Sequence, residues 1–146
     1  MKKIILKILL SGLLLIGTTG CNKENDENDK IFNNINVSEK LDTIINNGPK
    51  TSSIPFDYIK ASQDIYDELL NNPKETFEYA IKDLIETNVG NGLKSYLEAL
   101  LCLEINKNFQ YDFENANDFL EYYKEFLMDK NNNFNEYDKF TQKLLR

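Results

Sequence analysis

From Ile31 onward, apolar residues recur at steps of three and four positions and almost never alternate with polar residues. This spacing is the period of an amphipathic α-helix, whereas a half-buried strand would be apolar at every second position. The pattern therefore predicts an all-α domain over residues 31–146, built of five to six helices in antiparallel pairs. Consecutive pairs of this length would be compatible with a HEAT-like right-handed stack.

The predicted helices are separated by residues that start or stop helices. Gly48-Pro49 ends the first one, and Pro55 and Pro73 suit first helical positions. The first predicted helix is 38–46, and a short turn follows at 55–59. The next helix is capped by Ser62 and runs through Leu70, and another is opened by Asn72-Pro73-Lys74-Glu75 and runs to Thr87. The remaining helices are 92–106, which is capped by Asn91, then 115–128, and a last one that carries Phe134, Tyr137, Phe140 and Leu144.

The apolar stripes of these helices are expected to form one core. The stretch 99–103 is apolar on every side, which is typical of the central helix of a bundle. Cys102 lies in that stretch, so we expect a buried, unreactive thiol. In the helix 115–128, the side chains predicted to face inward are Phe119, Tyr122, Tyr123, Phe126 and Leu127.

Residues 1–21 carry the pattern of an export signal. Three lysines flank the start of an apolar run at 8–16 that is too short to cross a hydrocarbon core, which needs about 20 residues. Small residues at 17–20 lead to Cys21 and resemble the lipobox of bacterial lipoproteins, although Thr18 stands where a larger aliphatic residue is usual. The resemblance implies a signal peptide at 1–20 and lipidation of Cys21, which would anchor the chain on the extracytoplasmic face of the cell membrane. The alternative is an ordinary secretory signal that leaves Cys21 unmodified.

Charge limits the partners of the remaining chain. The segment 22–30 has no apolar residue and is predicted to be a disordered acidic linker. The first 20 residues hold three lysines and no acid, so the rest keeps 14 of the 17 basic residues and all 24 acidic ones, a net charge of −10. This balance argues against binding nucleic acid or anionic lipid headgroups, because both favour basic surfaces. A basic partner, a cation or simple solubility remain as explanations.

No residue set is typical of a catalytic or metal site. The sequence contains no histidine, which removes the commonest general base and the usual zinc ligand. The loop 129–140 has oxygen ligands at its first, third and fifth positions, as an EF-hand loop would, but Phe134 and Phe140 stand where glycine and glutamate are needed. We therefore expect an interhelical turn there, no cofactor, no metal and no enzymatic activity.

One acidic pattern is a candidate binding site. Asp118, Glu121, Glu125 and Asp129 follow one another at three- and four-residue steps and would share one helix face, defined here as the acidic stripe. A solvated face is the simpler interpretation, because like charges on an exposed helix destabilise it by only about 0.2–0.5 kcal/mol. The functional hypothesis is a docking surface for a basic segment of a partner protein.

Three short motifs carry a resemblance to a family. They are Pro55-Phe56-Asp57-Tyr58-Ile59-Lys60, Gly92-Leu93-Lys94-Ser95-Tyr96-Leu97-Glu98-Ala99-Leu100 and Phe119-Leu120-Glu121-Tyr122-Tyr123. Together they resemble a small helical domain at the C-terminus of uncharacterised Firmicute lipoproteins, over residues 51–126. The resemblance implies an envelope lipoprotein and offers no established activity. We expect a non-catalytic protein-interaction module, with a carboxylate-based envelope enzyme or a small-ligand-binding lipoprotein as alternatives.

Overall fold

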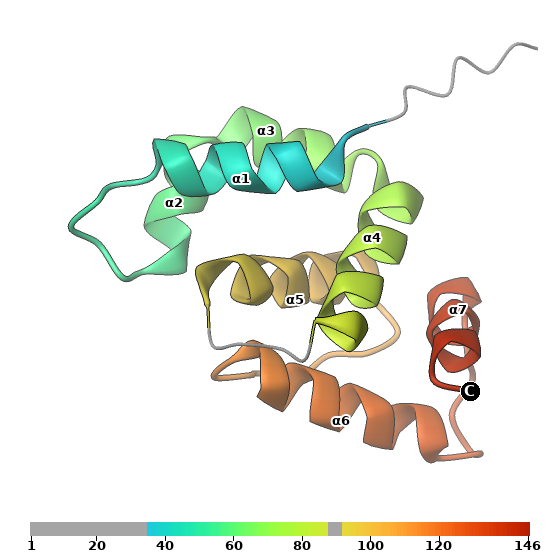
Figure 1. The fold of residues 1–146 in the computed structure, drawn as a ribbon. Coiled ribbons are helices and arrows are strands. Elements are labelled where there is room, and N and C mark those ends of the chain that lie inside the picture. Colours follow the sequence, from blue (N-terminus) through green and yellow to red (C-terminus); the bar gives the residue numbers. More distant parts are fainter. Residues whose placement is uncertain (1–34, 88–91) are drawn as a thin grey trace, which may run out of the picture. The chain divides into compact units, whose positions relative to one another are not determined.

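The computed structural model describes residues 35–87 and 92–146, which all belong to one compact unit, Asn33–Arg146. These residues form helices and no strand, so the all-α prediction is confirmed for them. The helices are α1 (Val37–Asn47), α2 (Pro55–Ala61), α3 (Gln63–Leu70), α4 (Pro73–Glu86), α5 (Leu93–Ile105), α6 (Ala116–Met128) and α7 (Glu136–Leu144) (Figure 1). The predicted signal peptide 1–20, Cys21, the linker 22–30 and the predicted cap Asn91 lie outside the described residues.

The segment after α1 forms a helix of its own where only a short turn was predicted. With α2, the described residues contain seven helices instead of five to six. Only Ser62 separates α2 from α3, and its φ of −141° and ψ of 43° leave the helical path. The predicted cap at Ser62 is wrong, because its side chain is buried and accepts a hydrogen bond from Asn47 Nδ2 at 3.2 Å. Ser62 thus ties the α2–α3 junction to the end of α1.

The start of α4 also differs from the predicted cap. Asn72 precedes Pro73 as expected, but its side chain donates to the carbonyl of Glu68 at 2.8 Å and caps nothing in α4. A buried bond from Thr76 Oγ1 to the carbonyl of Leu69, also 2.8 Å, joins the first turn of α4 to the end of α3. The α3–α4 corner is therefore held by threonine and proline rather than by an asparagine cap.

Gly48 ends α1 as predicted and also admits a close neighbour. Its backbone N–H donates to the carbonyl of Ile44, which closes the last turn. A Cβ built on Gly48 would overlap the ring of Tyr58, which belongs to α2. Tyr58 is fixed in this place by a hydrogen bond from its hydroxyl to the carbonyl of Ser52 at 2.8 Å. Glycine is thus needed for the approach of α2 to the end of α1.

The predicted central position of the fifth segment is confirmed. α5 packs against α1, α2, α3, α4 and α6, most extensively against α4, and its residues 97–102 are all buried. In Figure 1 it lies between the N-terminal helices and α6. Ala99 and Cys102 face one apolar cluster with α4 and α6, whereas Leu97, Leu100 and Leu101 face a second cluster with α1, α2 and α3. α5 therefore contributes buried side chains to both apolar clusters and separates them.

Within the described ranges, no helix combines the length and the apolar character needed to cross a membrane. The longest, α4, has 14 residues.

Candidate functional site

The acidic stripe lies along α6 and its C-terminal end. Asp118 is in the first turn, where its backbone N–H donates to Asn115 Oδ1 and its carboxylate accepts from the N–H of Glu114, both at 3.0 Å. Asp129 follows the last turn and accepts two hydrogen bonds of 2.9 Å from Asn131. The two outer members of the stripe thus bond to the backbone at the ends of α6, which is a structural role.

The two inner members have no such role. Glu121 and Glu125 are exposed, and the side chain of neither forms an ion pair or a hydrogen bond with another described residue. The opposite side of α6 buries Phe119, Tyr123 and Leu127. Helix geometry therefore exposes two carboxylates to solvent, and neither pairs with Lys124 of the same helix.

A hollow of about 610 Å³ lies beside the first half of the stripe. Its lining comes from α6 and from the connector that precedes it. We define the acidic aromatic surface as the six residues Tyr111, Asp112, Glu114, Asp118, Glu121 and Tyr122. Asn115 and Asn117 complete the lining, so four of the eight residues around the hollow carry carboxylates.

Two tyrosines form the aromatic part of this surface. The rings of Tyr111 and Tyr122 stack with centroids 4.1 Å apart and an interplanar angle of 25°. Tyr122 is 41% exposed, so the prediction that it faces the core is wrong. A hydrogen bond with the Tyr122 side chain raises the pKa of Tyr111 above its ordinary value, so the Tyr111 phenol stays neutral at physiological pH. The sequence pattern missed the pair because Tyr111 belongs to a non-helical connector.

Carboxylates beside exposed aromatic faces suit a cationic ligand. Acidic residues create a negative potential that attracts a basic segment, and a guanidinium or ammonium over a tyrosine face gains about 0.5–1 kcal/mol when exposed. Among the described residues no group of three or more acidic or sulfur side chains is placed to hold a metal ion. The chemistry of the acidic aromatic surface therefore fits lysine and arginine side chains.

Glu125 borders a different hollow from Asp118. That hollow, of about 410 Å³, lies between α4 and α6 and includes Glu121, Lys124 and Met128. Met128 is 76% exposed, and it offers an apolar side chain next to the acids. Glu121 lines both hollows, so it connects the acidic aromatic surface to the second half of the stripe.

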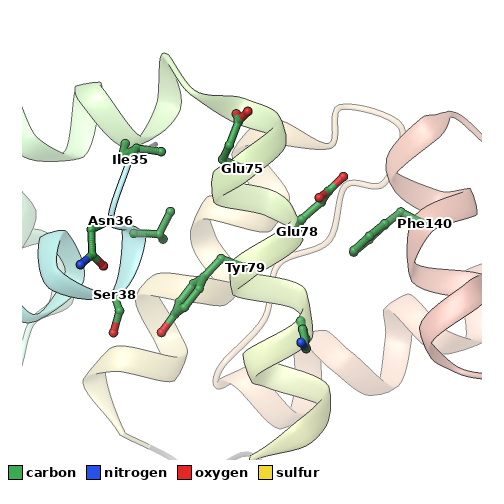
Figure 2. A pocket seen from close by; sticks show the side chains of 9 residues that line it. Ile35, Asn36, Ser38, Glu75, Glu78, Tyr79 and Phe140 are labelled. Carbon is green, nitrogen blue, oxygen red and sulfur yellow. The ribbon is translucent and has the colours of Figure 1, made fainter. Parts of the chain in front are cut away.

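A further hollow of about 700 Å³ lies between the start of α1, α4 and α7. Figure 2 shows Glu75, Glu78 and Tyr79 projecting from α4, with Phe140 of α7 on one side and Asn36 on the other. The hollow is open and combines acids with Lys82 and apolar side chains. Its composition is compatible with a small ligand, but no buried acid lines it.

The loop after α6 forms an interhelical turn held by its own side chains. Asn131 donates to Asp129, and the carbonyl of Asn133 accepts from Asn108 Nδ2 at 2.7 Å. The first and third positions of the calcium-like pattern are thus bonded to each other.

Cys102 is buried as predicted, and burial raises the pKa of its thiol well above the ordinary value.

A buried polar network docks α7 and was not predicted. Asp138 is fully buried, and its two carboxylate oxygens accept from Tyr123 Oη at 2.8 Å, Asn106 Nδ2 at 2.7 Å, Asn108 Nδ2 at 2.6 Å and the N–H of Asn135 at 3.0 Å. Burial raises the pKa of Tyr123, which keeps its hydroxyl a donor. With four donors on one carboxylate, the network is a structural lock between α5, α6 and α7.

Comparison of the chain with protein-family models, with curated proteins and with solved structures finds no match.

Proposed function

We propose that this chain is an exported bacterial lipoprotein whose helical domain binds a protein partner without catalysing a reaction. The anchor is the lipid on Cys21, and the docking surface is the acidic aromatic surface together with Glu125. The partner contributes a segment rich in lysine or arginine. The domain is thereby held on the extracytoplasmic face of the cell membrane, near the protein that it binds.

The single observation that carries the docking proposal is the environment of Glu121. It is exposed, has no ion-pair partner among the described residues, and borders both hollows along α6. A solvated face of purely structural value would gain from a lysine one turn away, as Lys82 and Glu86 illustrate on α4 at 3.8 Å. Lys124 stands one turn after Glu121 and borders one of the two hollows, but it forms no ion pair with Glu121 or Glu125, which leaves the charge of both acids available to a partner.

The export proposal rests on the sequence pattern of residues 1–21. A basic start, a short apolar run and small residues before Cys21 are the features of a cleaved and lipidated signal. Each buried methylene of an acyl chain contributes about 0.8 kcal/mol, so two or three chains hold a domain at a bilayer firmly. A membrane-spanning helix is not required for this form of attachment.

The docking proposal is tested by capture of the partner with charge variants of the full chain. Glu121→Lys/Glu125→Lys should abolish capture of a partner that the wild-type chain retains from envelope extract. The matched control is Asp42→Lys/Asp64→Lys, which makes the same change in net charge on exposed positions of α1 and α3. Capture by the wild type should weaken as salt is raised, because exposed charge pairs are screened within about 10 Å at 0.1 M ionic strength.

The outcomes separate docking from general charge effects. Equal loss with both double variants would show that net charge, and not the surface of α6, attracts the partner. Retention by the Glu121→Lys/Glu125→Lys variant would remove the acidic stripe from the proposal.

The alternatives have weaker support. A carboxylate enzyme needs an acid with a raised pKa in a cleft, but the one carboxyl group with a raised pKa among the described residues, that of Glu98, is fully buried. Binding of a small ligand would use the open hollow of Figure 2, which Glu75, Glu78 and Phe140 line together.

The helix contacts agree only in part with a HEAT-like stack. A HEAT-like stack is supported by the extensive pairing of the consecutive helices α4 and α5 and by the packing of α5 on α6. Contacts of α1 with α5 and of α4 with α7 join helices that are distant in sequence, which is less typical of a solenoid.

A further inference from the structure

A buried carboxyl group lies at the most extensive helix contact of the domain. Glu98 of α5 is 0% exposed, and neither of its carboxylate oxygens has a hydrogen-bond partner when the group is treated as an acceptor. Lys94, one turn earlier, is the nearest cation, with Nζ 3.5 Å from Oε1 of Glu98 in an ion pair that is not a hydrogen bond. An ionised carboxylate in this place would be poorly compensated for its loss of water.

The same lysine already serves a second carboxylate. Lys94 Nζ donates to Asp83 Oδ2 of α4 at 3.1 Å and to Tyr79 Oη at 3.2 Å, and it lies 5.5 Å from the centre of the Tyr79 ring. One cation therefore faces two acids. With Glu98 protonated the three groups are neutral in sum, whereas ionisation of Glu98 leaves an uncompensated negative charge in the α4–α5 contact.

A proton on Glu98 also repairs its hydrogen bonding. A protonated carboxyl group is a donor, and the side chain of Asp83 is the acceptor within hydrogen-bond reach. The protonated form thus links α5 to α4 through Glu98 and Asp83, in addition to the bond from Lys94 to Asp83.

We propose that Glu98, Asp83 and Lys94 form a proton-dependent latch that holds α4 against α5 and weakens when Glu98 releases its proton to water. The latch is independent of the proposed partner and of the lipid anchor. It explains why an acid stands in the middle of α5, whose residues 97–102 are all buried.

The other titratable groups around α5 do not supply the missing charge. Cys102, one turn after Glu98, is a buried thiol. On the remaining helices that pack against α5, four titratable side chains have partners of their own: Tyr66 of α3 with Glu104 of α5, Tyr123 of α6 with Asp138, Lys40 of α1 with Glu68, and Asp57 of α2 with Ser52. Glu121 and Glu125 of α6 are exposed to solvent, whereas Glu98 is buried. The balance at Glu98 is therefore decided by Asp83 and Lys94.

The direction of the pKa of Glu98 agrees with this geometry. Burial raises it to about 8, the neighbouring Asp83 adds to the rise, and Lys94 opposes it. A group whose pKa is higher in the folded than in the unfolded chain stabilises the fold fully below its unfolded pKa, near 4.3 for glutamate, and loses that contribution as the pH rises through the folded pKa. The domain should therefore lose stability between about pH 5 and about pH 8.

The test is the pH dependence of chemical unfolding of the full chain in a mild detergent. For the wild type, the unfolding equilibrium constant should rise roughly 10- to 100-fold between about pH 6 and about pH 8. Glu98→Gln keeps the shape and the donor of the protonated acid but cannot ionise, so its unfolding constant should stay nearly flat. The matched control, Glu86→Gln, changes an exposed glutamate of α4 and should keep the wild-type slope.

A second measurement avoids dependence on the folding of the variant. The carboxyl carbon of Glu98, followed by NMR in the wild-type chain, should titrate well above the exposed glutamates. A midpoint near the ordinary glutamate value, or a Glu98→Gln variant with the wild-type slope, would overturn the latch.

Discussion

Asp138 is the single residue on which the docking of α7 depends most. Replacing it with alanine would leave one amide hydrogen of Asn106 and the hydroxyl of Tyr123, both buried, without the acceptor they now share. Each unsatisfied buried group destabilises a fold by about 1–3 kcal/mol, so Asp138→Ala should lower the free energy of unfolding by about 3 kcal/mol or more. Urea denaturation measures the change.

The control for this prediction is Asp129→Ala. Asp129 is exposed, and its side chain bonds only to Asn131 of its own turn. The substitution should therefore lower the free energy of unfolding by no more than about 1 kcal/mol. Equal losses for both aspartates would mean that the buried network contributes nothing special.

Gly48 provides a second test at a single residue. Gly48→Ala places a methyl group in the ring of Tyr58 and should destabilise the domain by about 1–3 kcal/mol through overpacking. Gly92→Ala is the matched control, because a Cβ there meets nothing within 4 Å. Thermal unfolding of the two variants should show a clear fall in Tm for the first and little change for the second, and the reverse order would contradict the packing argument.

Sequence reasoning at the residue level found the apolar core but not the buried charges. The buried aliphatic residues of α1, α4 and α5 follow from helical spacing. Glu98 and Asp138 do not, because an acid in a helical pattern is normally assigned to solvent, and its burial depends on partners such as Asp83 or Asn106 that are distant in the chain. For Tyr122 the error was the opposite: the spacing predicted a buried side chain, but stacking on Tyr111 keeps it at the surface.

At the level of helices, some asparagines at N-cap positions accept a hydrogen bond from the backbone of the first turn, and others make no such bond. Asn115 accepts from the backbone N–H of Asp118 at 3.0 Å, whereas Asn72 makes no such bond at the start of α4. Asn115→Ala should therefore lower the free energy of unfolding by about 1 kcal/mol, and Asn72→Ala by less, because only the first removes a cap. Urea denaturation of both variants, compared at one pH, would contradict this order if Asn72→Ala were the more destabilising.

Helix positions were predictable where proline or glycine marks them, and less so elsewhere. Pro55, Pro73 and Gly48 stand at the boundaries they predicted. The division of α2 from α3 rests on the backbone of Ser62 alone, and its burial against Asn47 is a tertiary contact that no local pattern announces. The candidate site shows the same limit: spacing placed Asp118 and Glu121 on one helix, but only folding brings the connector residues Tyr111 and Asp112 to the same hollow.

The molecule as a whole combines an acidic helical domain with a different N-terminal segment. All the acidic residues follow residue 20, and the three lysines of the first 20 residues stand apart from them. Residues 21–146, with a net charge of −10, gain nothing from contact with anionic headgroups, so electrostatic attraction would not attach them to a membrane. In the proposed function, that attachment is the lipid on Cys21.

The two cysteines of the chain allow this attachment to be tested with an internal control. Cells that express the full chain and grow with labelled palmitate should incorporate the label into the wild type, because acylation is the proposed fate of Cys21. Cys21→Ser should abolish labelling. Cys102→Ala should keep it, since that thiol is buried in the domain and removing it leaves the signal intact. Label on the Cys21→Ser chain, or its absence from the wild type, would contradict lipidation, and a domain that folds in all three chains would leave the proposals on Asp138 and Glu98 standing.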